Sequence, residues 1–361
     1  MDTDARRQGE AAEGGAPEGV GGLLEIAAGG CFSRALAVAA RLRIADILDG
    51  AAMTSDDIAG RTGSDPEVML RLLQALAMRG VFVREGDGRF RLAESHAALR
   101  GDHPRSLRHH CILLAETYDD AFAGLLGTVM TGRSGFEEVF GMPLYPYLGR
   151  TPEREQVFDA AMAELAQPTA AAFAEHFSFS SPGRLIDVGG GNGTLLLSLL
   201  ARDPGLEGTC VDRPGVCARA AARMAKATDR ALADRIRFQP ADIFEEVPEG
   251  GGLYLLKNVL HDWSPEQGTR ILTAVRRAMT RTARTMARTG PPPRLIVLEP
   301  LLDRESDGAH ALYQMVLGGK EVRGFRTADD VWRLHTAAGL EPLSVTRLSD
   351  GHHAFESGCP G

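Results

Sequence analysis

The chain has 361 residues, of which 44% are hydrophobic and 24% charged, and its formal net charge at pH 7 is −8. This length exceeds one ordinary hydrophobic core and predicts two domains of a globular protein. The negative charge argues against broad nucleic-acid binding, which needs a positive field.

The five cysteines are scattered without a C-x-x-C pair, so neither a metal site nor a disulfide framework is expected. No apolar run is expected to reach the roughly 20 residues that cross a bilayer. The glycine-rich, acidic N-terminus does not have the pattern of a signal peptide. We therefore expect a cytoplasmic protein that has no membrane or nucleic-acid partner and holds no metal.

The N-terminal part of the chain changes character twice. Residues 1–21 carry few large apolar side chains, which predicts a disordered tail. Short amphipathic helices follow from about Leu23 to Leu99, and a hairpin pattern with a glycine-containing turn lies within 81–92. Residues 22–103 are thus predicted to form a winged-helix-like domain. Its acidic and basic side chains balance, which favours an interaction domain over a DNA-binding one.

Residues 104–176 show a helical pattern and are predicted to link the two domains. Within them, Phe158 and Met162 recur at helical spacing, either in a core stripe or in the wall of a pocket. Residues 177–361 then alternate between apolar strands and helices, which predicts a parallel sheet covered on both faces. The expected strands are 184–188, 208–211, 235–239, 252–256, 294–298, 342–347 and 353–357. The Arg- and Thr-rich stretch 280–293 is predicted to be a solvated insertion.

A glycine-rich turn follows the first of these strands. Asp187 precedes glycines at alternate positions, Gly189, Gly191 and Gly193, and a leucine-rich helical pattern comes next. Glycines at a helix start let a nucleotide-like ligand approach the backbone N–H groups without a side-chain clash. The spacing is G-x-G-x-G, whereas dinucleotide-binding folds use G-x-G-x-x-G. The turn, which has an ordinary strand-to-helix connection as its alternative, therefore indicates a cofactor without a pyrophosphate.

Two more acidic residues follow the next two strands. Asp212 lies about 20 residues after the glycine turn, where a carboxylate can accept both hydroxyls of a ribose. Asp242 can accept from an exocyclic amine, and the neighbouring Ile243 and Phe244 can sandwich an adenine ring. Because the carboxyl ends of parallel strands meet at one edge of a sheet, we expect these acids to converge on one ligand.

A histidine lies just before a predicted helix start. Ser264 and Gln267 have the spacing of a capping box, with Pro265 at the favoured first helical position. His261 and Asp262 therefore come between a strand end and a helix, at the mouth of the expected cofactor cleft. An imidazole with an ordinary pKa near 6.5 suits proton abstraction at neutral pH.

Two glutamates can orient that imidazole. Glu299 ends the strand 294–298, and Glu321 follows the sequence Gly-Gly-Lys. A buried carboxylate beside an imidazole fixes its tautomer and stabilises its protonated form. Either glutamate can alternatively be a solvated loop residue.

Three motifs together carry a family resemblance. They are Asp-Val-Gly-Gly-Gly-Asn-Gly at 187–193, Leu-Lys-Asn-Val-Leu-His-Asp-Trp-Ser at 256–264 and Leu-Glu-Pro at 298–300. With them the chain resembles, over about 23–355, the S-adenosylmethionine (SAM) dependent O-methyltransferases of the caffeate and acetylserotonin type, particularly bacterial members that act on aromatic natural products. The resemblance implies a Rossmann-like α/β domain with a mostly parallel seven-stranded sheet, and an N-terminal winged-helix domain, mainly α-helical, through which a homodimer forms.

The resemblance also implies roles for individual residues. His261 is the general base, flanked by Glu299 and Glu321, and the acceptor is an aromatic small molecule whose hydroxyl is methylated. SAM becomes S-adenosylhomocysteine, and no metal takes part. The implied cofactor contacts are Asp187, Gly189, Gly191, Gly193, Asp212, Arg213, Asp242, Ile243, Phe244 and Lys257. The implied acceptor contacts are Phe158, Met162, Asp262, Trp263 and Met315.

The chain departs from the family pattern in places. Residues 322–325 intervene before Arg326 and Thr327, which puts the role of Glu321 in question, and Ala166 stands where the family often has a polar residue. One alternative is a relative that binds SAM but performs decarboxylation, hydroxylation or pericyclic chemistry. Another is a winged-helix regulator that senses a small molecule. The sequence does not identify the acceptor, the methylated atom or any role for the Arg-rich stretch.

Overall fold

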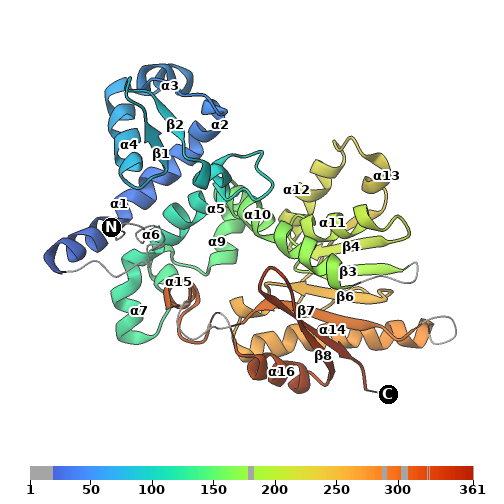
Figure 1. Ribbon diagram of the computed structural model, residues 1–361. Coiled ribbons are helices and arrows are strands. Elements are labelled where there is room, and N and C mark those ends of the chain that lie inside the picture. The colour runs from blue at the N-terminus through green and yellow to red at the C-terminus, as the bar shows by residue number, and fades with distance from the viewer. Residues whose placement is uncertain are drawn as a thin grey trace, which may run out of the picture. The chain divides into compact units, whose positions relative to one another are not determined.

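The computed structural model describes residues 19–177, 183–286, 291–301, 308–322, 324 and 326–360. The chain divides into two compact units, Met1–His96 and Ala97–Gly361, which Figure 1 colours along the sequence. Each unit contains its own secondary structure and its own hydrophobic core.

The described part of the first unit consists of helices and one antiparallel hairpin. Its elements are α1 (Gly19–Arg41), α2 (Ile44–Leu48), α3 (Ser55–Thr62), α4 (Pro66–Met78), β1 (Phe82–Arg84) and β2 (Phe90–Leu92). The side chains of Thr54 and Asp65 accept backbone N–H groups at the starts of α3 and α4, as good N-caps do. This order of helices and hairpin confirms the winged-helix-like prediction.

The start of this unit corrects two expectations. In place of short helices from Leu23, α1 is one continuous helix that begins inside the predicted tail, and residues 1–18 lie outside the described part of the chain. Its segment Gly21–Arg41 is long and apolar enough, by length and composition, to cross a membrane. The expectation that no apolar run has that length was therefore wrong. Leu23, Leu24 and Ile26 in this helix are 67–70% exposed.

The second unit begins with a helical segment, as its pattern predicted. The elements are η1 (Glu94–Leu99, which starts in the first unit), α5 (Arg108–Leu113), η2 (Leu114–Tyr118), α6 (Asp119–Ala121), η3 (Phe122–Gly124), α7 (Leu125–Thr131), α8 (Gly135–Phe140), α9 (Leu144–Arg150) and α10 (Pro152–His176). The carboxylate of Glu164 in α10 accepts the backbone N–H groups of His109 and His110 at 3.0 Å each. This contact ties the start of α5 to α10.

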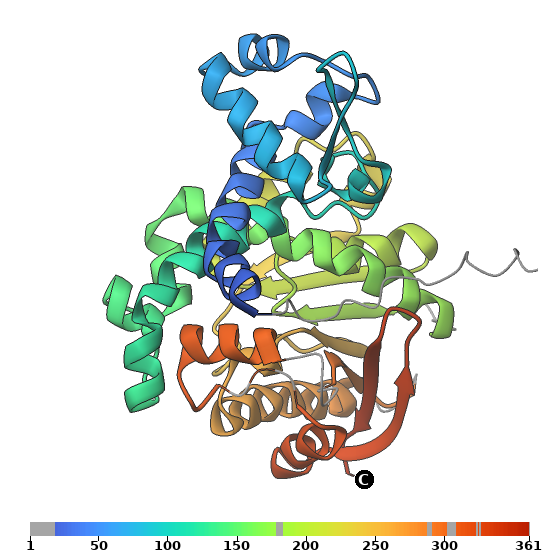
Figure 2. The same cartoon turned by 60° about the vertical axis from the view of Figure 1, so that its left-hand side comes forward.

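A mostly parallel sheet follows, in the strand order β5-β4-β3-β6-β7-β9-β8. Its strands are β3 (Arg184–Val188), β4 (Glu207–Asp212), β5 (Ile236–Pro240), β6 (Leu253–Lys257), β7 (Arg294–Pro300), β8 (Glu341–Arg347) and β9 (His352–Gly358). The strands β3 to β7 pair in parallel, and β9 runs antiparallel to both β7 and β8. Figure 2 shows this hairpin closing one edge of the sheet. All seven strands confirm the predictions to within about two residues.

Helices cover both faces of the sheet (Figure 1). Residues of α10 and of α11 (Thr194–Arg202) form one core layer with β3, β4 and β7. On the other face, α14 (Pro265–Met286) and α16 (Ala328–Ala337) form the second layer. The remaining helices are α12 (Pro214–Met224), α13 (Arg230–Ala233), η4 (Leu260–Asp262) and α15 (Gly308–Gly318). Buried on both sides, the central strands are apolar over most of their length, as parallel strands usually are, and their charged residues lie at or near the strand ends.

The expected insertion at 280–293 is the main error in the second unit, because α14 continues to Met286. Thr282 is fully buried, and its hydroxyl lies 2.9 Å from the hydroxyl of Tyr254 and accepts the backbone N–H of Gly250 at 2.8 Å. The polar composition of this segment led to the prediction of an insertion, although it forms the end of a helix whose inner face packs on the sheet. Residues 287–290 lie outside the described part.

Candidate active site

The glycine turn connects β3 to α11 in left-handed backbone geometry. The φ angles of Gly189, Gly191 and Gly193 are +71°, +60° and +79°, a region that glycine enters without steric cost. A Cβ on Gly193 would lie 3.0 Å from the ring of Phe238, whereas a Cβ on Gly191 would meet nothing within 4 Å. Gly193 therefore serves packing against β5, and Gly191 leaves open space beside the backbone.

Two carboxylates stand at the ends of β3 and β4. Asp187 is 1% exposed, and neither of its carboxylate oxygens has a hydrogen-bond partner among the described residues. Burial, together with the nearby carboxylate of Asp212, raises the pKa of Asp187 to about 7. Asp212 accepts the backbone N–H groups of Gly191 at 2.8 Å and Arg213 at 2.7 Å. Burial nevertheless raises the pKa of Asp212 as well.

These carboxylates line a cleft of about 570 Å³, a volume typical of small-molecule sites. The cleft receives nine of the ten expected cofactor residues, namely Asp187, Gly189, Gly191, Asp212, Arg213, Asp242, Ile243, Phe244 and Lys257. Gly193 does not line it, because this glycine faces β5. SAM fits this lining, since an unpaired buried carboxylate suits an ammonium group and an acid at the end of β4 suits a ribose.

Lys257 lies at the end of β6 and lines the cleft. Burial lowers the pKa of its amine to about 8, against the opposing carboxylates of Glu299, Asp350 and Asp187. Its Nζ donates to the carbonyl oxygen of Leu165 at 3.3 Å. Lys257 therefore ties α10 to the end of β6, and both elements line the cleft.

His261 lies in η4, between β6 and α14. The helix start that follows has the predicted capping box: Ser264 Oγ accepts the N–H of Gln267, and Gln267 Oε1 accepts the N–H of Ser264, each at 3.2 Å. Arg326, which is 7% exposed, donates from its guanidinium to the carbonyl oxygens of Leu260 and Trp263. Backbone contacts on both sides of His261 thus fix the loop that carries it.

Glu299 at the end of β7 is 3% exposed and contacts the imidazole directly. Its Oε2 lies 2.6 Å from Nδ1 of His261. Burial opposes ionisation, yet His261 keeps the pKa of Glu299 below its ordinary value. Burial also opposes charge on His261, but Glu299 and Asp262 outweigh it and raise the pKa of that imidazole. Ionised Glu299 accepts a hydrogen bond from Nδ1–H, so the lone pair of neutral His261 lies on Nε2.

The second carboxylate beside the imidazole differs from the expected one. Asp262 Oδ1 lies 3.4 Å from Nε2 of His261, whereas Glu321 lies exposed in the turn after α15 and does not line the cleft. The backbone explains this position: Gly319 ends α15 with φ +77°, and the N–H of Lys320 donates to the carbonyl oxygen of Gly132 at 2.9 Å. Glu321 is therefore exposed and outside the lining of the cleft, whereas the resemblance implied a place beside His261.

Aromatic side chains form the other end of the cleft. Phe158, Met162, Asp262 and Trp263 line it as expected, together with Tyr145, which no sequence motif indicated. Tyr145 stacks on Trp263 with ring centroids 5.3 Å apart and an interplanar angle of 24°. This flat apolar wall adjoins the carboxylate of Asp262.

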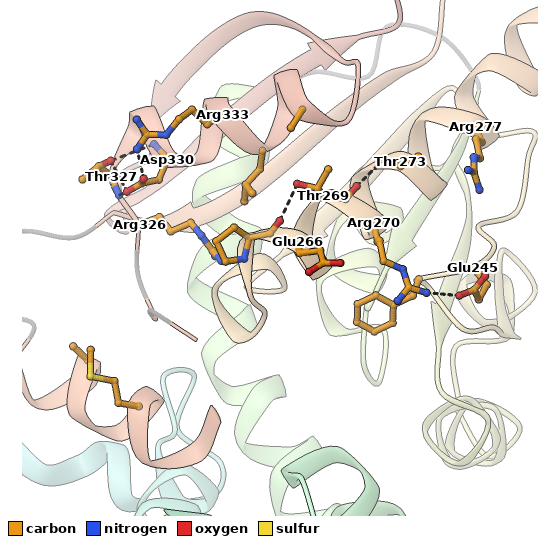
Figure 3. A pocket seen from close by; sticks show the side chains of 16 residues that line it. Glu245, Glu266, Thr269, Arg270, Thr273, Arg277, Arg326, Thr327, Asp330 and Arg333 are labelled. Atoms are coloured by element: carbon orange, nitrogen blue, oxygen red, sulfur yellow. Dashed lines mark hydrogen bonds and ion pairs between the residues drawn. The ribbon is translucent and has the colours of Figure 1, made fainter. Parts of the chain in front are cut away.

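Met315 lies elsewhere, in an outer hollow of about 1070 Å³ along α14 and α16. Figure 3 shows this hollow, where Arg270 pairs with Glu245 and Arg333 pairs with Asp330. Although this hollow is larger than the cleft, four of its charged side chains are taken up by these two ion pairs. Perturbed buried carboxylates mark functional sites, and these line the cleft. Within the described residues no group of three or more His, Cys, Asp or Glu is arranged to hold a metal.

Comparisons with known proteins agree with this geometry. The O-methyltransferase domain model matches residues 122–341, and the O-methyltransferase dimerisation domain model matches residues 24–98. The O-demethylpuromycin-O-methyltransferase of Streptomyces alboniger is 34% identical over 90% of this chain and 87% of its own. The solved structure of LaPhzM is 31% identical, covers 94% of this chain and 98% of its own, and has a TM-score of 0.82. NcsB1 from neocarzinostatin biosynthesis, solved with SAM and 2-hydroxy-5-methyl naphthoic acid, is 27% identical over 91% of this chain and 96% of its own, with a TM-score of 0.74.

Proposed function

This chain belongs to the family of SAM-dependent O-methyltransferases, and we propose that it methylates a phenolic or enolic hydroxyl of an aromatic secondary metabolite with His261 as the general base. The observation that carries the proposal is the contact of Glu299 with Nδ1 of a buried histidine beside the cofactor cleft. The aromatic wall of Tyr145, Phe158 and Trp263 supports a flat acceptor.

The base is needed because a phenol with a pKa near 10 is only about 0.1% ionised at neutral pH. SAM supplies an electrophilic methyl group on a sulfonium. His261 Nε2 takes the hydroxyl proton as the oxygen attacks, a contribution of about 10²–10⁴ in rate. Glu299 stabilises the imidazolium that forms, and the cleft walls align the acceptor oxygen for in-line attack, which contributes at least as much.

Family relationship and exposed surface support a homodimer. We infer that the dimerisation domain pairs two chains through α1, whose Leu23, Leu24 and Ile26 are exposed in the single chain. The helices of 104–176 contribute the acceptor side of the cleft through Tyr145, Phe158 and Met162. The net charge of −8 agrees with a protein that binds no nucleic acid, and we place the enzyme in the cytoplasm without a membrane partner.

The test is release of S-adenosylhomocysteine by purified protein given SAM and a panel of phenols, hydroxylated aromatic acids and quinones. Release coupled to a product heavier by one methyl group supports the proposal, and analysis of that product identifies the methylated atom. SAM binding without consumption, across a broad panel, favours instead a relative that uses the sulfonium for other chemistry.

A further inference from the structure

We propose that Tyr145 is a positioning residue that fixes the carboxylate of Asp262 against the catalytic imidazole of His261, an inference that rests on the proposed role of His261 as base. The three residues come from α9 and η4, which are far apart in the sequence. Tyr145 itself belongs to none of the motifs that define the cofactor site or the base.

The contacts form a continuous line to the base. Tyr145 donates its phenolic proton to Oδ2 of Asp262 at 2.5 Å. The other oxygen of the same carboxylate, Oδ1, lies 3.4 Å from Nε2 of His261. Because one carboxylate serves both neighbours, the phenol determines how Asp262 is turned toward the imidazole. Gln314 in α15 also faces Asp262 and opposes the rise in its pKa.

Tyr145 is itself held from several sides. Its ring stacks on Trp263 and meets Phe158 edge-on, with centroids 6.0 Å apart at 87°. The guanidinium of Arg213 lies 5.2 Å above the same ring and donates to the carbonyl oxygen of Tyr145 at 3.2 Å. Arg213 follows Asp212, the acid expected to bind the ribose. Tyr145 therefore connects the loop after β4, on the cofactor side, to the loop that carries His261. Burial keeps the pKa of Tyr145 well above its ordinary value, so the phenol remains a donor.

The electrostatic consequence follows from the charge of Asp262. Burial raises the pKa of Asp262, and the hydrogen bond from Tyr145 is among the groups that oppose this rise. Without the phenol, Asp262 is protonated over more of the pH range. His261 then loses negative charge beside Nε2, and the pKa of His261 falls.

Other groups around these residues are left unchanged when only the phenolic hydroxyl is removed. Glu299 and Lys257 face His261, whose ring also contacts that of His310. Tyr118 faces Asp262, and Arg326 faces Glu299. Tyr145→Phe keeps all of these side chains and removes the hydrogen bond from the Tyr145 hydroxyl to Asp262, so a shift in the titration of His261 reports the loss of that contact.

The experiment compares Tyr145→Phe, which keeps the stacked ring, with Tyr147→Phe in the same helix. Tyr147 packs against Phe136 and Phe140. Histidines labelled with ¹³C are titrated by NMR in the absence of acceptor, and the His261 signal is assigned as the one missing from His261→Ala. We expect Tyr145→Phe to lower the His261 midpoint by at least about 0.5 pH unit and Tyr147→Phe to leave it unchanged.

Kinetics supply the second readout. We expect the acidic limb of the kcat profile of Tyr145→Phe to move to lower pH, with kcat lower by about 10- to 100-fold and SAM affinity retained. An unchanged His261 midpoint in a variant whose melting temperature matches the wild type would overturn the inference. Failure of the proposed function is a separate result, because the wild-type enzyme would then release no S-adenosylhomocysteine while the NMR titration remained measurable.

Discussion

Glu299 contacts the side chain of His261 through one carboxylate oxygen and holds the backbone of the same loop through the other. Its Oε2 lies 2.6 Å from Nδ1 of the imidazole. Its Oε1 accepts the N–H groups of Val259 at 3.1 Å and Leu260 at 2.8 Å. A single buried carboxylate therefore fixes the position, the tautomer and the charge of the base.

Replacing Glu299 with Gln is expected to lower kcat by about 10²- to 10⁴-fold, because the amide cannot stabilise the imidazolium. The charge of Glu299 raises the pKa of His261, and the base must be neutral to act. Wild-type activity therefore falls as the pH drops through this raised value, and in Glu299→Gln the fall moves to lower pH. Profiles of kcat between pH 5 and 9 measure both effects, and an acidic limb at the wild-type position would contradict the assignment.

Asp262 and Glu321 make a matched pair of acids for a second test. Glu321 is exposed, so Glu321→Gln is expected to change kcat by less than about twofold, as surface substitutions usually do. Asp262→Asn removes the charge beside Nε2 and is expected to lower kcat by about 10-fold or more. Both variants are assayed at saturating SAM and acceptor. A large loss in Glu321→Gln would show that this turn closes over the base during catalysis.

Gly191 and Gly193 allow the packing role of the glycine turn to be tested separately from its role in ligand binding. Alanine at Gly191 or at Gly193 meets an unfavourable positive φ, which costs about 1–2 kcal/mol. Only at Gly193 does the new methyl also press on Phe238. We expect Gly193→Ala to have the lower melting temperature, and Gly191→Ala to have the greater loss of S-adenosylhomocysteine affinity. Calorimetry of unfolding and of binding checks the two orders, and equal losses of affinity would place Gly193 at the ligand as well.

Local sequence patterns predicted the sheet because each buried strand is an apolar run ended by a turn residue. Asp187, Asp212 and Glu299 were predicted as site residues for the same reason, since strand ends collect ligand groups at one edge. The prediction of the secondary structure failed where a polar composition indicated a loop although the residues form a helix. The Arg- and Thr-rich end of α14 indicated solvent, although the buried Thr282 shows that one face of that helix packs on the sheet.

The contacts that complete the site could not be read from local patterns. Tyr145 and Asp262 are 117 positions apart, and Arg326 reaches the carbonyl oxygen of Leu260 across 66 positions. Tyr145 belongs to no motif, and the family pattern at Arg326 does not indicate this contact, because both residues act through the place where the fold puts them. The same limit applies to Glu321, for which the family pattern indicated a place beside His261, although it lies exposed in the turn after α15.

The buried carboxylate of Asp187 is expected to lower the stability of the ligand-free protein and to strengthen ligand binding. Its pKa in the folded protein, about 7, lies above the ordinary value of 3.8, so the folded state holds this proton more tightly than the unfolded state. Stability is therefore lost as the pH rises from about 4 to about 7. At pH 8 the ligand-free Asp187→Asn variant is expected to melt at a higher temperature than the wild type, because it buries no unpaired charge.

The same substitution is expected to weaken binding, because the ammonium group of the ligand pairs with the ionised form of Asp187. In the wild type, the Kd of S-adenosylhomocysteine should rise by up to about 10-fold per unit as the pH falls below 7. In Asp187→Asn, that dependence should flatten and affinity at pH 8 should be lower. Titration calorimetry at several pH values measures the slopes. A wild-type slope retained in the variant would assign the pH dependence to another group, such as Asp212, a second acid in the cleft whose pKa is raised by burial.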